Sequence, residues 1–131
     1  MEKELKGIVA ANSVPADLTV TYDDMHGLWG GTTITVRGDG SVERRTRALG
    51  APEAEVTRKQ VGAPELVDFV RLLVELEAWV QRTEDVPPVA DESRARLTIS
   101  VGGSRSSLWE RVREMPANER LLPIKSRLMT L

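Results

Sequence analysis

The longest regular pattern in the chain runs through residues 63–82, where hydrophobic side chains recur every three or four positions. This spacing places them on one face of an α-helix. Pro64 and Glu65 suit its first turn, because a proline loses no helical hydrogen bond there and a carboxylate faces the unpaired amide groups. The pattern therefore predicts a long helix that packs against the rest of the fold through Leu66, Phe69, Val70, Leu73, Leu76 and Val80.

Shorter segments of the chain alternate between hydrophobic and polar residues, which is typical of strands with one buried face. They comprise residues 17–22, 32–37, 41–48, 55–61, 95–101 and 106–113. The glycines on either side of Asp39 supply a tight turn, and so do Gly102 and Gly103. We therefore expect an antiparallel hairpin at each of these two places.

A final helix should follow, with Asn118 as its N-cap or with a start near Leu122, because Pro123 is best tolerated in a first turn. In this order the elements predict a two-layer α+β domain: an antiparallel sheet of about four to six strands, packed by one long helix, with a short C-terminal helix. The length of 131 residues suits one domain. We assign residues 17–131 to it and expect residues 1–16 to form a mobile or loosely packed N-terminal arm.

Between residues 17 and 131 the chain combines a strand, a Gly-Asp-Gly turn, a second strand, a leucine-rich helix, an acidic loop, a hairpin and a short C-terminal helix. In this order of elements it resembles small uncharacterised bacterial α+β domains. The resemblance implies the same two-layer fold. These families share no agreed activity, so the resemblance implies no catalytic, cofactor-binding or partner-binding residue.

The composition of the chain narrows the chemistry open to it. It has no cysteine, which excludes disulfides, thiolate catalysis and cysteine-ligated zinc or iron–sulfur clusters. Its 18 basic and 20 acidic side chains give a formal net charge of −2, so no strong global field attracts nucleic acid or a membrane surface. No stretch approaches the roughly 20 apolar residues that span a bilayer. A cytoplasmic protein is the default expectation, and a mature chain whose export signal has been removed is the alternative.

The only histidine, His26, follows Asp23 and Asp24 in a glycine-rich loop, and these three side chains are a candidate metal or proton-transfer site. However, a metal needs about four ligands in fixed geometry, and a solvated turn explains neighbouring loop carboxylates better. We expect no metal, no cofactor and no catalytic residue. A second acidic cluster after the long helix lacks the central glycine of a calcium-binding loop; it comprises Glu84, Asp85, Asp91 and Glu92.

Two features are candidates for binding. Arginines gather on the first hairpin, where Arg45 and Arg47 share one strand face and Arg44 takes the other. Together with Arg58 they are able to contact phosphate groups, although charged side chains also keep sheet edges from aggregating. Trp29, in the glycine-rich loop, is the candidate exposed aromatic residue and would anchor a partner.

These observations favour a non-enzymatic binding or protein-interaction domain whose partner is another protein or a second copy of the chain. An anion- or nucleic-acid-binding module that uses the arginine-rich hairpin is the first alternative. The balanced charge and the small number of aromatic residues argue against nucleic acid. A carboxylate- or metal-dependent enzyme is the second alternative. The candidate binding residues are Trp29, Arg44, Arg45, Arg47 and Arg58.

Overall fold

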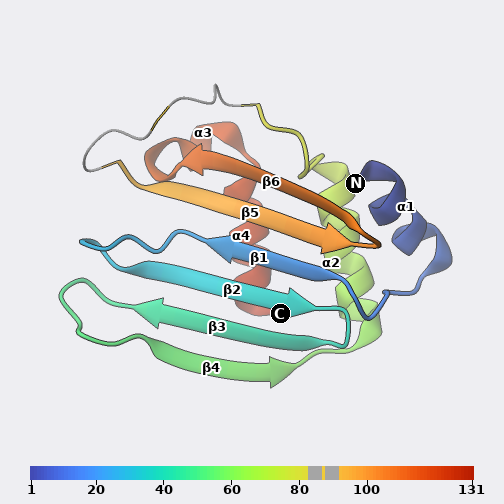
Figure 1. Cartoon of the computed structure of the whole chain (residues 1–131), viewed down its shortest axis with the longest axis horizontal. Coiled ribbons are helices and arrows are strands. Elements are labelled where there is room, and N and C mark those ends of the chain that lie inside the picture. Colours follow the sequence, from blue (N-terminus) through green and yellow to red (C-terminus); the bar gives the residue numbers. More distant parts are fainter. Residues whose placement is uncertain (83–86, 88–91) are drawn as a thin grey trace.

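The fold is a six-stranded antiparallel sheet with its helices gathered on one face (Figure 1). The computed structural model describes residues 1–82, 87 and 92–131. The observed layers confirm the predicted two-layer α+β fold. The strands are β1 (Thr19–Asp23), β2 (Gly31–Arg37), β3 (Ser41–Arg47), β4 (Glu55–Gln60), β5 (Arg94–Val101) and β6 (Ser104–Arg111). The helices are α1 (Glu2–Ala11), α2 (Ala63–Glu75), α3 (Met115–Asn118) and α4 (Leu121–Thr130), with a 3-10 turn at Val112–Glu114.

The strand order in the sheet is β4-β3-β2-β1-β5-β6, and each neighbouring pair is antiparallel. The first four strands follow one another directly, and the connection through α2 then brings β5 beside β1. Both predicted hairpins are confirmed, because β2 pairs with β3 and β5 pairs with β6 in antiparallel register. In their turns Gly40, Gly102 and Gly103 have positive φ angles, which glycine adopts without strain, whereas Gly38 does not.

The core lies between the sheet and the helices. Alternation along each strand turns one set of side chains toward the helices and the other set toward solvent. On the helix-facing side, the fully buried residues include Val20, Tyr22, Ile34, Leu97 and Ile99. They meet the predicted apolar face of α2, where Leu66, Phe69, Val70 and Leu73 are buried.

The two edge strands of the sheet differ in what covers them. Every residue of β4 is exposed. On β6, by contrast, the Gln81 side chain bonds the backbone of Trp109 twice: Oε1 accepts from the amide at 2.8 Å, and Nε2 donates to the carbonyl oxygen at 3.0 Å. A neighbouring strand would make the same pair of hydrogen bonds.

Helix α2 ends at Glu75, well before the predicted end at residue 82. Glu77 takes a left-handed φ of 48° and turns the chain. Arg120 then donates to the carbonyl oxygens of Leu76 (3.1 Å), Glu77 (2.5 Å) and Val80 (2.8 Å). These bonds satisfy carbonyl groups that a longer helix would pair internally. Val80 is consequently 38% exposed, and its predicted packing against the sheet was wrong.

The predictions for the two ends of the chain also need correction. Residues 2–11, expected to belong to a loosely packed arm, instead form α1, which packs beside α2 and buries Leu5 and Ile8. At the other end, Asn118 closes the short α3 and is not the N-cap of the final helix. Helix α4 begins at Leu121, close to the alternative start predicted near Leu122, and Pro123 lies in its first turn. None of the described helices is both long enough and apolar enough to cross a membrane.

Candidate functional site

The β1–β2 loop does not bring the candidate metal residues together. The Asp23 carboxylate stays at the surface, where it accepts hydrogen bonds from the Met25 amide (2.8 Å) and the Thr33 hydroxyl (3.1 Å). His26 Nδ1 accepts a hydrogen bond from the Leu28 amide at 3.0 Å. Within the described residues, no group of three or more histidine, aspartate or glutamate side chains could hold a metal ion.

Of the second acidic cluster, only Glu92 falls within the described residues; Glu84, Asp85 and Asp91 lie outside them. Glu92 forms ion pairs with Nε of Arg94 (2.9 Å) and Nε of Arg111 (2.5 Å). Although burial raises the pKa of Glu92, the hydrogen bonds from Arg111 and Arg94 lower it more, and the resulting pKa is below the usual value. Glu92 therefore joins the start of β5 to the end of β6.

Asp24 anchors the β1–β2 loop from the inside. Its Oδ1 accepts from the Thr32 amide at 2.7 Å, and its Oδ2 accepts from the Tyr22 hydroxyl at 2.7 Å and from Lys125 Nζ at 2.6 Å. Because Lys125 lies on α4, the ion pair ties the loop to the C-terminal helix. Burial, together with the hydrogen bond to Asp24, raises the pKa of Tyr22 far above its usual value. The carboxylate of Asp24 therefore has a structural role: it fixes the β1–β2 loop to the start of β2 and to α4.

Asp24→Asn should lower the free energy of unfolding by about 1–3 kcal/mol, because asparagine keeps the side-chain shape but only one acceptor oxygen, and its amide nitrogen cannot accept a hydrogen bond in place of the other carboxylate oxygen. Asp23→Asn makes the same change one residue away at an exposed position and should cost less than about 0.5 kcal/mol. Urea denaturation measures the free energy of unfolding of both variants. Equal losses for the two variants would contradict an anchoring role for Asp24.

Arg47 fastens the β1–β2 loop to the β3–β4 loop. Its Nη2 donates to the carbonyl oxygens of His26 (2.7 Å) and Gly27 (2.9 Å), and its Nη1 donates to that of Ala51 (3.2 Å). Gly30 lies against the Arg47 backbone with a φ of 78°, and a Cβ there would overlap the Arg47 carbonyl oxygen. Only glycine fits this position. The guanidinium of Arg47 is therefore taken up in holding two loops at one end of the sheet.

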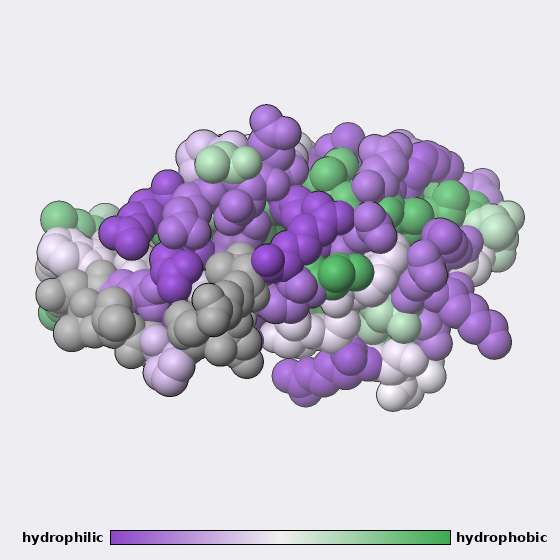
Figure 2. Space-filling model, turned by 90° about the horizontal axis from the view of Figure 1, so that it is seen from above, coloured by the Kyte–Doolittle hydropathy of each residue, from purple (hydrophilic) through white to green (hydrophobic). Residues whose placement is uncertain are grey.

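Three hydrophobic side chains project from these two loops, and we call them the loop-end patch. Leu28 is 61% exposed, Trp29 is 54% exposed and Leu49 is 68% exposed. No other large hydrophobic side chain among the described residues is more than 38% exposed. Figure 1 shows both loops at the left end of the sheet, and Figure 2 shows hydrophobic residues at that same end. The exposure of Trp29 is as predicted; Leu28 and Leu49 were missed, although each stands close to loop glycines.

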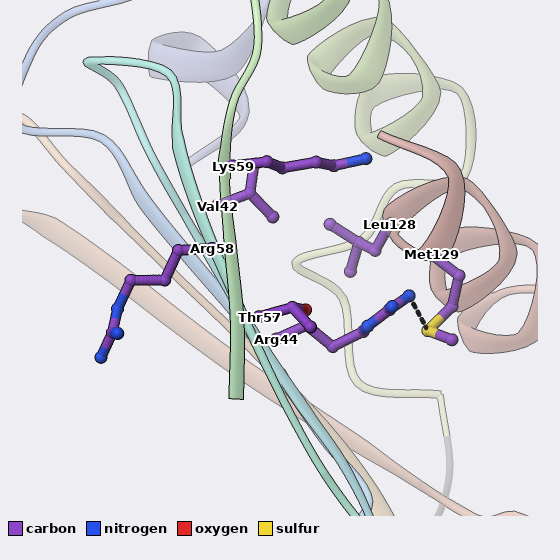
Figure 3. Close-up of a pocket in the computed structure, with 7 residues that line it drawn as sticks. All are labelled: Val42, Arg44, Thr57, Arg58, Lys59, Leu128 and Met129. Carbon is purple, nitrogen blue, oxygen red and sulfur yellow. Dashed lines mark hydrogen bonds between the residues drawn. The ribbon is translucent and has the colours of Figure 1, made fainter. Parts of the chain in front are cut away.

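The other predicted arginines do not share one surface. Arg44 lies on the helix side of β3, with its Nη1 3.8 Å from the Met129 sulfur of α4. Arg58 points away from that side and pairs with Glu43 at 3.1 Å (Figure 3). Arg45 is exposed and lies on the same face as Arg58. Its register partner on β4 is Val56, which is two residues from Arg58 and therefore shares its face. The hairpin arginines are thus divided between the two faces of the sheet.

A groove of about 200 Å³ separates β3 and β4 from α4. It exists because the helices stop short of β4, which leaves the helix-facing side of that strand open (Figure 3). Its lining mixes aliphatic and basic side chains, and it holds no carboxylate. The side chains that point into it are Val42, Arg44, Thr57, Lys59, Leu128 and Met129.

The chain matches no protein-family model and no curated protein. No functional residue is therefore carried over from a relative. What the described residues offer is a pair of loops held together by hydrogen bonds and carrying exposed hydrophobic side chains, together with arginines on both faces of the sheet.

Proposed function

We propose that the chain is a non-enzymatic protein-binding domain and that the loop-end patch of Leu28, Trp29 and Leu49 is its contact surface. The observation that supports this most is the bonding of Arg47, which holds two separate loops so that their hydrophobic side chains project at the same end. Hydrophobic side chains that are grouped and exposed mark sites of protein interaction.

Contacts within the β1–β2 loop hold its tip in one conformation. His26 and Gly30 exchange backbone hydrogen bonds of 2.8 and 3.0 Å, which close the tip of the loop. The Trp29 ring stacks on the His26 ring, with ring centroids 6.2 Å apart. A loop that becomes ordered only on binding loses affinity to its own conformational entropy. A tryptophan held in this way offers a large apolar surface at a small entropic cost.

The shape of the patch indicates what the partner must provide. The three side chains stand on loop tips at the end of the sheet, so the complementary surface is a concave hydrophobic pocket. Tryptophan is among the residues most enriched at the centre of such contacts. Within the patch, Trp29 is therefore expected to contribute more than either leucine.

Trp29→Ser should weaken binding of the partner about 30-fold or more, which is the loss typical of a hot-spot residue. Affinity purification of the tagged chain from cells that produce it identifies the partner, and titration of the purified pair measures the affinity. Leu122→Ser is the matched control, because Leu122 is 38% exposed and lies on α4 outside both loops. It should leave the affinity unchanged.

The partner in this proposal is another protein or a second copy of the chain, and sedimentation velocity separates these cases. Self-association that disappears in Trp29→Ser indicates a second copy. A partner that binds Trp29→Ser as tightly as it binds the wild type would place the contact elsewhere and contradict the proposal. A chain that stays monomeric at high concentration and captures no partner would contradict it as well.

A further inference from the structure

No described helix covers the sheet face opposite α1, α2 and α4, and this face is basic. In Figure 1 this face is turned toward the viewer, and the helices lie behind the sheet. Arg47 keeps its positive charge, but its guanidinium donates to loop carbonyl oxygens at one end of the sheet, so it is left out of the contact surface considered below. Among the remaining described residues of this face and its ion-pair partners, arginines outnumber acids; they are Arg37, Arg45, Arg58, Arg94, Arg96, Arg105 and Arg111 against Asp23, Glu43, Glu92 and Glu114.

Four of these residues, Arg37, Arg45, Arg96 and Arg105, are exposed and form no ion pair with any described residue; we call them the open-face arginines. The other three arginines of the face form ion pairs with the carboxylates of Glu43, Glu92 and Glu114. Asp23 stands opposite Arg96 in the ladder between β1 and β5 and offsets part of its charge. The face still carries a local excess of positive charge on a chain whose formal net charge is −2.

Strand register arranges the open-face arginines in two rows. Arg45 and Arg96 lie on the row of Asp23, and Arg37 and Arg105 lie on the row of Thr19. The rows are separated by the length of β1, which is about 14 Å at roughly 3.4 Å per residue. Within a row, the two arginines are three strand spacings apart, which is again about 14 Å at roughly 4.8 Å each.

Between the two rows runs a ladder of hydroxyl groups. Thr35, Thr21, Thr98 and Ser107 stand side by side in register across β2, β1, β5 and β6. These short side chains keep the centre of the face low between the longer arginines. Their hydroxyl donors, like guanidinium groups, are common partners of phosphate oxygens.

We propose that this open face binds the phosphate backbones of double-stranded nucleic acid, with one row of open-face arginines on each strand. The separation of the rows is close to the width of the major groove, about 12 Å, across which two backbones face each other. Contacts to phosphates position a protein on a duplex without reading its sequence. Local charge can act in this way on an acidic chain, because charges beyond a Debye length of about 8–10 Å are largely screened.

The same face is poorly suited to single strands. Proteins bind single strands by stacking the bases on exposed aromatic rings. The aromatic residue of this face is Trp109, which is 4% exposed and lies beneath Arg94, with Cζ 3.7 Å from the ring centroid. The proposal goes beyond the loop-end patch, and it uses neither Arg44 nor Arg47, whose guanidinium groups point elsewhere.

Fluorescence anisotropy with a labelled DNA duplex of about 20 base pairs tests the proposal. Four phosphate contacts at about 0.9 each give a slope of about −3.6 for the logarithm of affinity against the logarithm of salt concentration. Affinity should therefore fall roughly 100-fold between about 50 and 200 mM salt. A labelled single strand of the same length should bind more weakly than the duplex.

Substitutions locate the contact on the open face. Arg45→Gln should reduce the magnitude of the salt slope by about 0.9, and replacing all four open-face arginines by glutamine should abolish binding at low salt. Arg127→Gln is the control, because it removes an exposed arginine from α4 on the opposite side of the sheet; it should leave the slope unchanged. All these positions are exposed, so the variants should keep the wild-type melting temperature.

Three results would overturn the proposal. They are an absence of duplex binding at low salt, duplex binding by the fourfold variant that equals that of the wild type, and tighter binding of the single strand than of the duplex. Polyglutamate is included as a second probe. If it binds and the duplex does not, the face belongs to an acidic protein partner.

Discussion

Arg120→Ala is expected to lower the free energy of unfolding by about 3–5 kcal/mol. Arg120 is 3% exposed, and its guanidinium donates to three backbone carbonyl oxygens just beyond the end of α2. Alanine would leave these carbonyl groups without their donor, and a buried polar group left unpaired costs about 1–3 kcal/mol. Burial lowers the pKa of Arg120, but an arginine remains charged at every pH at which the chain folds.

Two further variants test this result: Arg120→Lys is the conservative substitution, and Arg113→Ala is the control at an exposed position. A lysine keeps the positive charge but lacks the planar guanidinium that bridges three carbonyl groups. Arg120→Lys should therefore lower the free energy of unfolding, but by less than Arg120→Ala does. Arg113 is exposed in the 3-10 turn before α3, and its replacement should change stability by less than about 0.5 kcal/mol. Chemical denaturation measures the free energy of unfolding of all three variants. An Arg120→Ala loss no larger than that of Arg113→Ala would show that the guanidinium does not hold the end of α2.

Phe69→Ala is expected to cost about 3–5 kcal/mol, the usual range when a buried aromatic side chain is removed and its cavity stays open. Phe69 is 0% exposed and belongs to the buried face of α2, between the sheet and the other helices. Because Phe69 belongs to the close-packed core cluster, the surrounding residues have little freedom to collapse into the cavity.

The comparison for Phe69 uses two further variants. Phe69→Leu refills most of the volume and should cost clearly less than alanine. Glu75→Ala, at an exposed position of the same helix, should stay within about 0.5 kcal/mol of the wild type. The midpoint of urea denaturation reports each change. A midpoint unaltered by Phe69→Ala would rule out the packing of α2 described above.

Strands such as β2 and β5 could be predicted because their side chains alternate between a buried face and a more exposed one. The exposed β4 has no buried face, so its alternation was weaker evidence. Ile34 and Val36, or Leu97 and Ile99, are spaced by two residues and all lie fully buried. The glycines of the two hairpin turns marked the ends of these segments. For these segments the local pattern agrees with the tertiary structure, so the positions of the strands along the sequence could be predicted without knowledge of distant residues.

The end of α2 could not be predicted in the same way. The hydrophobic spacing continues through Leu76 to Val80, so the local pattern extends the helix too far. What ends the helix is a donor from Arg120, which lies far along the chain and reaches these carbonyl groups only after folding. Helix α1 was missed for another reason: it buries only Leu5 and Ile8, too few residues to form a recognisable period.

The candidate site could be predicted only in part. Trp29 stood out because it is an aromatic residue in a glycine-rich loop. The bonding of Arg47 to both loops depends on the pairing of β2 with β3, so its position in the sequence does not reveal it. The rows of open-face arginines likewise require β5 to lie beside β1. Alternation shows which residues of a strand share a face, but it does not show which strands are neighbours.

The hydrogen bonds between Gln81 and Trp109 set a limit on how copies of this chain could join through their sheets. A fibre grows when both edges of a sheet accept a new strand, because each added copy must present a fresh edge to the next. The β4 edge is uncovered along its whole length, but Gln81 already occupies part of the β6 edge in the way a strand would. Pairing through β4 would therefore stop at two molecules, joined about a twofold axis, and the closed pair would have no second full edge from which a filament could extend.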